Sequence, residues 1–581
     1  MHSTIEPLEA RISPAALVGN VLTYTDIDGD LVKVTFTNAA MAAGDFSFSA
    51  GSVDGTTNSP QGLSYMNLGG KTGAGFTLTA SPHLGKGDSH ANIGIIDGLN
   101  TDLGVVVVDG DVSQIAAGSG AAGSVGLKSF QALSMNRLSA VGAICQLKNA
   151  ASFTVKTDVT NIVLNFAGGI KTLSIGGNLE ETVDGTLASI KVTGDAGSIK
   201  IGGSIIARSG GDRNLFIVGD AGTIAIGGSV RGGSANLVNV GQGQIEIRGA
   251  TKSVTIGGDL AGSGAFGSGS LVTRDGLDVL KIGGSVIGGA GDDSGYIHIG
   301  NASKTISIGG SVLGGLAHSN SGYLEIFSAT SVKIGGSVIG NSGDSGSGIV
   351  GVGEVGSFVI GHDFIGGNST GASAVSYSGQ LTFDTVGSLT IGGDFIGGRV
   401  LGAGSLDSGC SVINVTKTIG SLKIGGSILG DRNHLARITV GGGTVPDAVT
   451  VLQSLTVKGS VQSATILTGY SSFFDTFNPD AGIGSITIGG DFVGSLIHAG
   501  DSKGNDGIPG TADDDTLSLI ATITSVKVGG AVTGLAGSPI QFGIHAPILL
   551  KATIGQATYD RLQLQGAVLF NSIGLAYVSS N

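Results

Sequence analysis

The sequence contains no tryptophan, and aromatic residues make up only 5% of its 581 residues. Basic residues are also scarce, because 30 lysines and arginines stand against 43 acidic residues and leave a net charge of −13. No basic cluster stands out, so we expect no nucleic-acid partner. The chain also lacks a run of eighteen apolar residues, so we expect no membrane-spanning segment.

An export signal is not evident either. Residues 1–20 contain no apolar stretch of about 7–15 residues and little basic charge before one, so they do not predict a standard signal peptide. Glycine is abundant instead, with 108 residues, more than double its usual share of about 7%. Because 40% of the residues are hydrophobic, this glycine content does not indicate a disordered chain.

One phrase is repeated thirteen times between residues 173 and 532. It reads apolar residue, spacer, Ile or Val, usually Gly-Gly, a small polar residue and another apolar residue, most often at a step of 26 residues. A near-fixed period of this size predicts a stack of structural repeats. The Ile or Val of each copy stands at Ile175, Ile201, Ile226, Ile256, Ile282, Ile308, Ile334, Ile360, Ile391, Ile424, Val457, Ile488 and Val528.

Each phrase begins with a strand signal. The Ile and the apolar residue two positions before it face the same side of a strand, and the residue between them faces the other side. We expect the apolar pair to point inward, as in Ile306 and Ile308. Five outward positions carry lysine, and because like charges in register repel, we expect no two of them to be paired neighbours. These lysines are Lys200, Lys281, Lys333, Lys423 and Lys527.

The Gly-Gly pair is expected to break the strand at a corner, where glycine takes a positive φ cheaply and lets one backbone pass close to another. A second short strand follows the corner. A third lies in the middle of the repeat, as in Gly295-Tyr-Ile-His-Ile299 and Gly322-Tyr-Leu-Glu-Ile326. Helix is a poor competitor, because each glycine inside a helix costs roughly 1 kcal/mol relative to alanine.

The sequence therefore predicts an all-β protein, a single-stranded parallel β-helix (β-solenoid) with three short strands in each coil of about 26 residues. The general rule for parallel crossovers makes it right-handed. A propeller blade, the alternative, needs roughly 40 residues. We expect an N-terminal motif and β cap over 1–90, parallel β-helix repeats over 91–537 and a C-terminal cap over 538–581. The N-terminal zone contains a hairpin signal around Asp28-Gly29.

Only two cysteines are present, Cys145 and Cys410. They lie about ten coils apart in such a stack, and at ~4.8 Å per coil they are too distant for a disulfide, which needs Cα atoms within about 7 Å. We interpret them as small buried hydrophobic residues, with pairing between chains as the alternative.

The segment from Ile5 to Ala16, which reads IEPLEARISPAA, resembles the short N-terminal motif of large surface or secreted β-repeat proteins from Planctomycetes and Verrucomicrobia. That motif is written around Leu-Glu-Pro-Arg, and here Ala10 stands in place of its proline. The segment from Tyr24 to Asp30 and the glycine-rich phrases resemble those proteins too. The resemblance implies an exported structural or adhesive solenoid, and it supplies no catalytic residues.

Two acidic segments are candidates for calcium. Asp26, Asp28 and Asp30 alternate as in the first half of a calcium loop, but Leu31 and Thr37 occupy the positions of the expected Gly and Glu, which favours an exposed hairpin turn. The better candidate is an oxygen-rich insert between two repeats, with a solvated acidic loop as the alternative. Its predicted ligands are Asp501, Asn505, Asp506, Asp513, Asp514 and Asp515.

The small polar residue after Gly-Gly is expected to bond backbone groups at the corner. At two successive copies this residue is Asp363 and Asp394, so parallel stacking would place like charges about 5 Å apart unless they diverge or share a cation.

Catalytic residues are not predicted. Parallel β-helices include polysaccharide lyases and hydrolases, but their sites need acidic residues, a base and usually an aromatic groove. The histidines are scattered at different points of the repeat. We therefore expect a non-catalytic, structural or adhesive solenoid outside the cell or on its surface, with polysaccharide or other surface proteins as partners. The alternative is a carbohydrate-binding or polysaccharide-degrading β-helix. The histidines in question are His298, His318, His362, His434 and His498.

Overall fold

The computed structural model describes most of the chain, and the backbone divides into two compact units, 1–254 and 255–581. The described residues are 15–49, 61–83, 85–138, 141–208, 213–234, 242–316, 320–341, 348–367, 378–398, 412–431, 435–443, 449–470, 478–500, 505, 518, 520–534, 542–571 and 574–579. Both units are built almost entirely of β-strands, which confirms the predicted all-β class. Among the described residues no helix has the length and apolarity needed to cross a membrane.

Unit 1 begins with antiparallel strands. The predicted hairpin is confirmed, because β2 (Val21–Thr25) pairs with β3 (Asp30–Thr37) in antiparallel register. The remaining elements of this region are β1 (Ala16–Val18), the 3-10 turn η1 (Ala43–Asp45), β4 (Phe46–Phe48), β5 (Leu63–Asn67) and β6 (Gly75–Pro82). From β5 and β6 onward the pairing becomes parallel.

The parallel strands of unit 1 form three rows, one for each face of the coil. The first row is β8 (Leu103–Val108), β10 (Leu127–Ala132), β13 (Ala150–Val155), β16 (Ile170–Ile175), β19 (Ala196–Ile201) and β22 (Ala221–Ile226). The second row starts in β9 (Asp111–Gly118) and continues as β11 (Ser134–Met135), β14 (Val159–Thr160), β17 (Leu179–Glu180), β20 (Ile205–Ile206) and β23 (Val230–Arg231). The third row is β7 (Ile93–Leu99), the end of β9, β12 (Ala143–Leu147), β15 (Ile162–Phe166), β18 (Ser189–Val192), β21 (Leu215–Ile217) and β24 (Ile245–Ile247). The unit boundary falls inside β25 (Thr251–Ile256).

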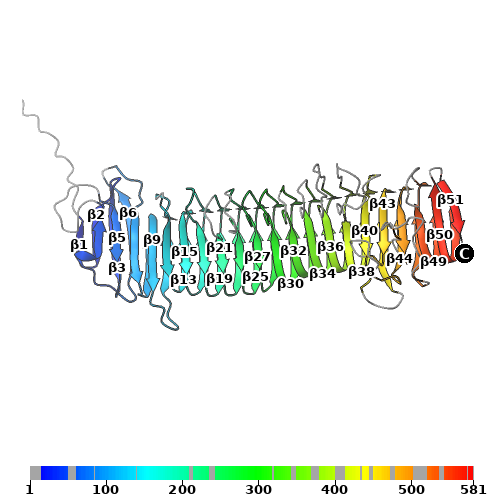
Figure 1. The fold of residues 1–581 in the computed structure, drawn as a ribbon. Helices are drawn as coiled ribbons and strands as arrows, with labels where there is room; N and C mark the ends of the chain where they lie inside the picture. The colour runs from blue at the N-terminus through cyan, green and yellow to red at the C-terminus, as the bar shows by residue number, and fades with distance from the viewer. Residues whose placement is uncertain are drawn as a thin grey trace, which may run out of the picture. The chain divides into compact units, whose positions relative to one another are not determined.

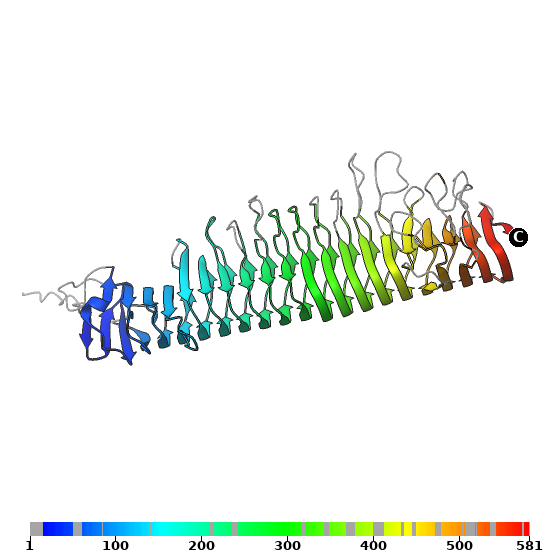
Figure 2. The ribbon, with the colours of Figure 1, turned by 60° about the horizontal axis from the view of Figure 1, so that its bottom comes forward.

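Unit 2 differs from the prediction because two of the three strands run together. The strands β27 (Leu271–Thr273) and β28 (Leu277–Ile282) both pair with one long strand, β30. A register shift between Ile299 and Ala302 bends the chain without ending the strand, so the mid-repeat strand continues into the next phrase. The long strands, side by side in green and yellow-green in Figure 2, are β30 (Ile297–Ile308), β32 (Leu324–Ile334), β34 (Ile349–Ile360), β36 (Gln380–Ile391) and β38 (Val412–Ile424).

Beyond β38 the long strand separates again into two rows. One row is β40 (Ala436–Val440), β43 (Ala464–Thr468) and β46 (Leu496–Ala499), and the other is β41 (Thr450–Val457), β44 (Gly482–Ile488) and β47 (Thr522–Val528). Both rows end on β49 (Gly543–Ile554), and β50 (Ala557–Asn571) and β51 (Gly574–Ser579) then pair antiparallel. The corner strands are β26 (Leu260–Ala261), β29 (Val286–Ile287), β31 (Val312–Leu313), β33 (Val338–Ile339), β35 (Phe364–Ile365), β37 (Phe395–Ile396), β39 (Ile428–Leu429), β42 (Val461–Gln462), β45 (Phe492–Val493) and β48 (Val532–Thr533).

Parallel stacking of successive coils, which Figure 1 shows within each unit, confirms the predicted β-solenoid. The hand of the coil and the boundaries of the caps stay predictions. Pairing does change from antiparallel to parallel near the first predicted boundary and back to antiparallel after β49. At the first change β6 pairs with antiparallel β3, and at the second β49 pairs with antiparallel β50, so these two strands are not edge strands.

The predicted inward rows form the core. Ile282, Ile308 and Ile334 are paired neighbours in β28, β30 and β32, and each is at most 1% exposed. Phenylalanines replace the aliphatic residues in some coils, and Phe364 stacks on Phe395 with ring centroids 5.0 Å apart. Alternation of side chains along each strand therefore sets which residues are buried.

The lysine prediction is confirmed. Lys333 lies between Ser307 and Val359, and among the described strand pairs no two of the five outward lysines are partners. Cys145 is buried in β12 as expected, and burial raises the pKa of its thiol to about 12. Cys410 lies outside the described residues.

The glycine corners were explained only in part by the sequence. None of the described Gly-Gly pairs that follow the core strands takes a positive φ, so this half of the explanation is wrong. Close backbone approach is the reason. A Cβ on Gly309 would lie 2.3 Å from the carbonyl oxygen of Gly283, and a Cβ on Gly310 would lie 2.3 Å from Oγ of Ser285. The first glycine thus makes room for the preceding backbone, and the second makes room for the preceding corner side chain.

That corner side chain forms a hydrogen bond to the next coil, as predicted. Oγ of Ser285 accepts from the N–H of Ser311 at 3.0 Å, and Oγ of Ser311 accepts from the N–H of Ser337 at 3.0 Å. The two stacked aspartates follow the same rule. Oδ1 of Asp363 accepts the N–H of Asp394 at 2.8 Å, and Oδ1 of Asp394 accepts the N–H of the next corner residue at 2.6 Å. Backbone donors therefore stabilise this pair, and a shared cation is not needed.

Candidate functional site

A groove crosses the outer face of four neighbouring long strands of unit 2. Its volume is about 550 Å³. Residues from β30, β32, β34 and β36, and Tyr323 just before β32, line it: His298, Tyr323, Glu325, Phe327, Glu354 and Asp384 carry its polar and aromatic character. These residues stand at outward positions, because the neighbouring Ile299, Leu324, Ile326 and Phe383 are buried in the core.

Glycines in one strand create the hollow. In β34 the inward positions are Val350 and Val352, whereas the outward positions between them and beyond are Gly351 and Gly353. The strand therefore presents bare backbone to solvent, while β32 on one side carries large side chains. Oη of Tyr323 leans to within 3.1 Å of the place that a Cβ on Gly351 would occupy. The bare backbone of β34 thus forms the floor of the groove.

Tyrosines stack at one end of the groove. Tyr296 and Tyr323 occupy equivalent places on successive coils, and their ring centroids lie 5.7 Å apart at an interplanar angle of 25°. Burial, assisted by the charge of Glu325, raises the pKa of Tyr323 to about 12, and burial likewise raises the pKa of Tyr296. Both phenols are therefore neutral donors at neutral pH.

Glu325 is the centre of a small hydrogen-bond cluster. Its Oε2 accepts from the hydroxyl of Tyr296 and lies 2.9 Å from Nδ1 of His298. Burial works to raise the pKa of Glu325, but the hydrogen bonds from Tyr296 and His298 and the charge of His298 outweigh it, so the pKa is lowered. The ionised carboxylate therefore stabilises the fold above the usual carboxylate range, and this contribution is lost as pH falls through the lowered pKa.

The other end of the groove carries two more carboxylates and one ammonium group. Nζ of Lys417 lies 3.6 Å from a carboxylate oxygen of Glu354 and 3.9 Å from one of Asp384. Between the two ends the ring of Phe327 is 64% exposed. The groove thus presents flat aromatic surface beside hydrogen-bonding groups of both signs.

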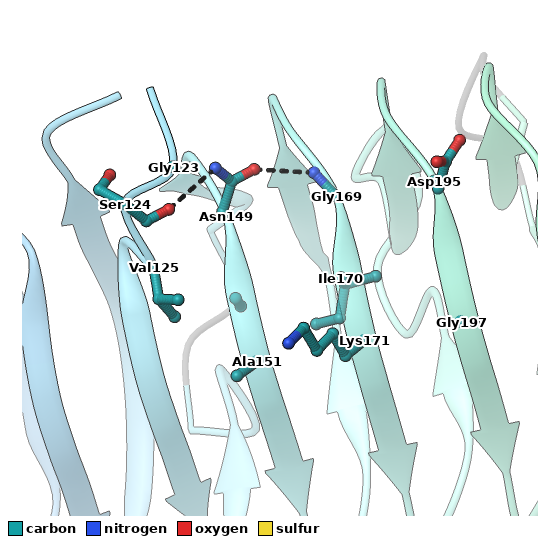
Figure 3. Close-up of a pocket in the computed structure, with 11 residues that line it drawn as sticks. Gly123, Ser124, Val125, Asn149, Ala151, Gly169, Ile170, Lys171, Asp195 and Gly197 are labelled. Carbon is teal, nitrogen blue, oxygen red and sulfur yellow. Dashed lines mark hydrogen bonds between the residues drawn. The ribbon is translucent and has the colours of Figure 1, made fainter. Parts of the chain in front are cut away.

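A second hollow, shown in Figure 3, lies in unit 1 and has a volume of about 500 Å³. Its lining is mainly Gly, Ala, Val and Ile, and Asn149 belongs to a corner ladder, because its Oδ1 accepts the N–H of Gly169 at 2.9 Å. Lys171 and Asp195 are its charged residues. This hollow therefore offers little chemistry for specific recognition.

Most of the site residues predicted from the sequence are not among the described lining residues of this groove. Of the predicted calcium ligands, Asn505 is an exposed turn residue, and the five aspartates lie outside the described residues. Among the described members of the predicted histidine set, His298 lies in the groove. His362 occupies a corner, and His498 is 1% exposed beside Tyr470. His318 and His434 lie outside the described residues.

Sequence reasoning missed Tyr296, Tyr323 and Glu325 as functional candidates. The signal was available, because the segments 295–299 and 322–326 read GYIHI and GYLEI. Aligned as neighbouring coils, they place tyrosine over tyrosine and His298 over Glu325, which is the pairing that the structure has.

Comparison of the chain with protein-family models, with curated proteins and with solved structures gave no match. The fold and the groove together define the class: a parallel β-solenoid with a solvent-open groove across one face.

Proposed function

We propose that the chain is a structural or adhesive β-solenoid of the cell exterior or cell surface, which attaches to polysaccharide through the groove over β30, β32, β34 and β36. The observation that carries the proposal is the groove itself, because it joins aromatic and acidic side chains along one face. A structural solenoid without attachment chemistry would present only small polar residues there. The likeness of the N-terminal segment to exported β-repeat proteins supports the location.

The charge of the groove favours neutral or amino sugars over acidic ones. Glu325, Glu354 and Asp384 place three carboxylates along it, against Lys417 and His298. A polyanionic saccharide would meet like charge, whereas hydroxyl groups can donate to carboxylates and accept from the Lys417 ammonium. The exposed face of Phe327 and the edge of Tyr323 supply apolar contact for sugar rings.

Replacement of Tyr323 by alanine tests this proposal. The substitution removes the stacked ring at the groove, so we expect binding to a neutral polysaccharide to weaken about tenfold, which corresponds to about 1.4 kcal/mol. Affinity electrophoresis in gels containing neutral, amino or acidic polysaccharides provides the measurement. Phe266→Ala is the matched control, because Phe266 is 41% exposed in the same unit but does not line the groove. Equal retardation of the wild-type chain and Tyr323→Ala in every gel would contradict the proposal.

Polysaccharide degradation is the second candidate. The specific observation in its favour is the Tyr296, Glu325 and His298 cluster, which combines a carboxylate, an imidazole and a phenol within hydrogen-bond distance. If the cluster is catalytic, incubation with the retained polysaccharide produces new reducing ends or unsaturated products, and Glu325→Gln abolishes them. Binding without either product leaves the adhesive function as the better account.

We also propose, from the sequence alone, a calcium site in the insert at 501–515, because five aspartates and Asn505 supply oxygen ligands there. We expect Ca²⁺ to protect the insert from proteolysis at Lys503, because the ion offsets repulsion among the carboxylates. Cleavage is followed by mass spectrometry during a calcium titration, with cleavage at other sites of the same chain as the internal control. Identical cleavage rates in calcium and in chelator would identify an ordinary solvated loop.

A further inference from the structure

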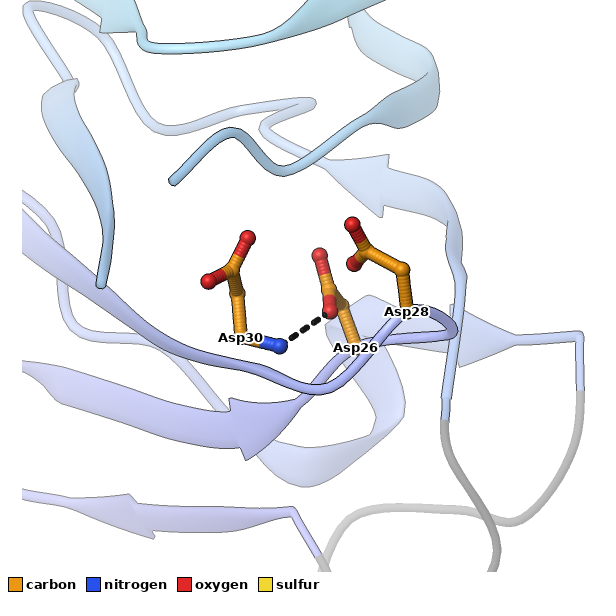
Figure 4. A group of neighbouring side chains, drawn as sticks. All are labelled: Asp26, Asp28 and Asp30. Carbon is orange, nitrogen blue, oxygen red and sulfur yellow. Dashed lines mark hydrogen bonds between the residues drawn. The ribbon is translucent and has the colours of Figure 1, made fainter. Parts of the chain in front are cut away.

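Three aspartates at the first hairpin turn of unit 1 are brought together by the fold. Asp26, Asp28 and Asp30 each offer one carboxylate oxygen, and these oxygens all lie within 4.8 Å of one another. Figure 4 shows the three side chains pointing to the same side of the turn between β2 and β3. The sequence analysis favoured an exposed turn. The turn is confirmed, but its exposure is wrong for two of the three residues, because Asp26 is 6% exposed and Asp30 is 0% exposed.

A segment nearly sixty residues away covers the cluster. The N–H of Asp88 donates to Oδ2 of Asp28 at 3.2 Å, and the N–H of Ser89 donates to Oδ2 of Asp30 at 2.8 Å. Gly87 approaches so closely that a Cβ on it would lie 2.0 Å from Oδ1 of Asp30. The covering segment therefore shields Asp30 from solvent within a group of three carboxyl groups.

The decisive feature is one oxygen of Asp30. Its Oδ1 is buried and has no hydrogen-bond partner, and Figure 4 shows the Asp30 carboxylate on the same side of the turn as those of Asp26 and Asp28. Among the described residues no lysine or arginine forms an ion pair with any of the three aspartates. A buried anionic oxygen without a donor is costly, and a bound cation removes that cost.

We propose that Asp26, Asp28 and Asp30 bind one Ca²⁺ ion between the β2–β3 turn and the segment around Gly87. The donors are all hard oxygens, which suit calcium, and the protein oxygens leave room in a shell of 6 to 8 ligands for water. The arrangement is not a helix-flanked calcium loop, because β3 continues directly from Asp30. The ion fastens the hairpin to the covering segment.

Burial and like charge both act on the carboxylate of Asp26. Burial, then a hydrogen bond with Asp28 and the charge of Asp28, raise the pKa of Asp26 from 3.8 to about 7. Tyr24, Asp28 and Asp30 on the hairpin interact with Asp26, and on the covering segment Lys86 lies beside Gly29 and Asp88 beside Asp28.

Calorimetric titration of the chelator-treated full chain with CaCl₂ tests the site. We expect Asp30→Asn to bind one ion fewer than the wild-type chain. Asp28→Asn, at the exposed member of the cluster, gives the same loss if Asp30→Asn does not fold. Asp88→Asn is the matched control, because its carboxylate accepts only the N–H of His90 and lies outside the cluster.

A second variant distinguishes calcium binding at this site from calcium binding at the insert. A chain with the triple substitution Asp513→Asn, Asp514→Asn, Asp515→Asn should still bind the ion at the hairpin. Adding Asp30→Asn to this triple variant should abolish that binding. Thermal unfolding distinguishes calcium binding from a purely structural role of Asp30. Without calcium, the unfolding midpoint of Asp30→Asn should be no lower than that of the wild-type chain. Calcium should then raise the midpoint of the wild-type chain only. An unchanged ion count in both Asp30→Asn and Asp28→Asn overturns the proposal, as does a triple variant that binds none.

Discussion

Ile308→Asp is expected to destabilise unit 2 by about 4 kcal/mol or more. Ile308 is 0% exposed and lies in the stacked row between Ile282 and Ile334, so the new carboxylate would have apolar neighbours on both sides. No water can reach it and no donor faces it from either neighbour. The measurement is the midpoint of thermal or urea unfolding, followed by circular dichroism.

The neighbouring residue provides a matched control. Ser307 points outward and is paired with Lys281 on one side and Lys333 on the other. Ser307→Asp therefore introduces the same side chain between two positive charges, and we expect it to be neutral or to stabilise by about 0.2–1 kcal/mol. If both variants melted at the wild-type midpoint, the assignment of Ile308 to the core would be untenable.

Gly309→Ala is the second prediction with a large effect. The added Cβ would meet the carbonyl oxygen of Gly283 at 2.3 Å. This carbonyl cannot rotate away as a side chain can, because the N–H of the same peptide, that of Gly284, donates to the carbonyl oxygen of Gly258 at 2.9 Å. We expect a loss of about 1–3 kcal/mol, as for other overpacked positions. Equilibrium unfolding in urea measures this loss.

Gly351→Ala is the control for the corner. Gly351 also lies in a strand of unit 2, but a Cβ there would meet only the end of the Tyr323 side chain, at 3.1 Å, which can shift. Because alanine reduces the entropy of the unfolded chain, we expect this variant to be unchanged or up to about 1 kcal/mol more stable. A Gly309→Ala chain as stable as Gly351→Ala would show that the corner glycine is not required for close approach.

The sequence could not give the chemistry of the corner in full. It showed that two glycines precede a small polar residue, and it predicted a hydrogen-bonded corner. The structure shows that the second glycine is set by the residue of the preceding coil: Oδ1 of Asp394 lies 2.0 Å from the place of a Cβ on Gly426. A contact between residues 32 positions apart has no signature within one phrase, so only the stack reveals it.

The groove was hidden from the sequence for a similar reason. Its residues come from four coils whose lengths differ, and the register shifts between β30 and β32. Phe327, Gly353 and Asp384 therefore share the groove although no fixed period relates them. The pairing of His298 with Glu325 is the more regular part of the site. It follows the repeat, so an alignment of neighbouring coils could have predicted it.

What the sequence by itself determined is the all-β class, the parallel stack, the inward rows and the first hairpin. Those features depend on side-chain alternation and on glycine corners, which recur every coil and are local. Only the tertiary structure decided which outward side chains meet and which acidic residues are buried. Asp30 is buried because a segment around Gly87, nearly sixty residues away in the sequence, covers it. The residues next to Asp30 in the sequence do not predict this contact.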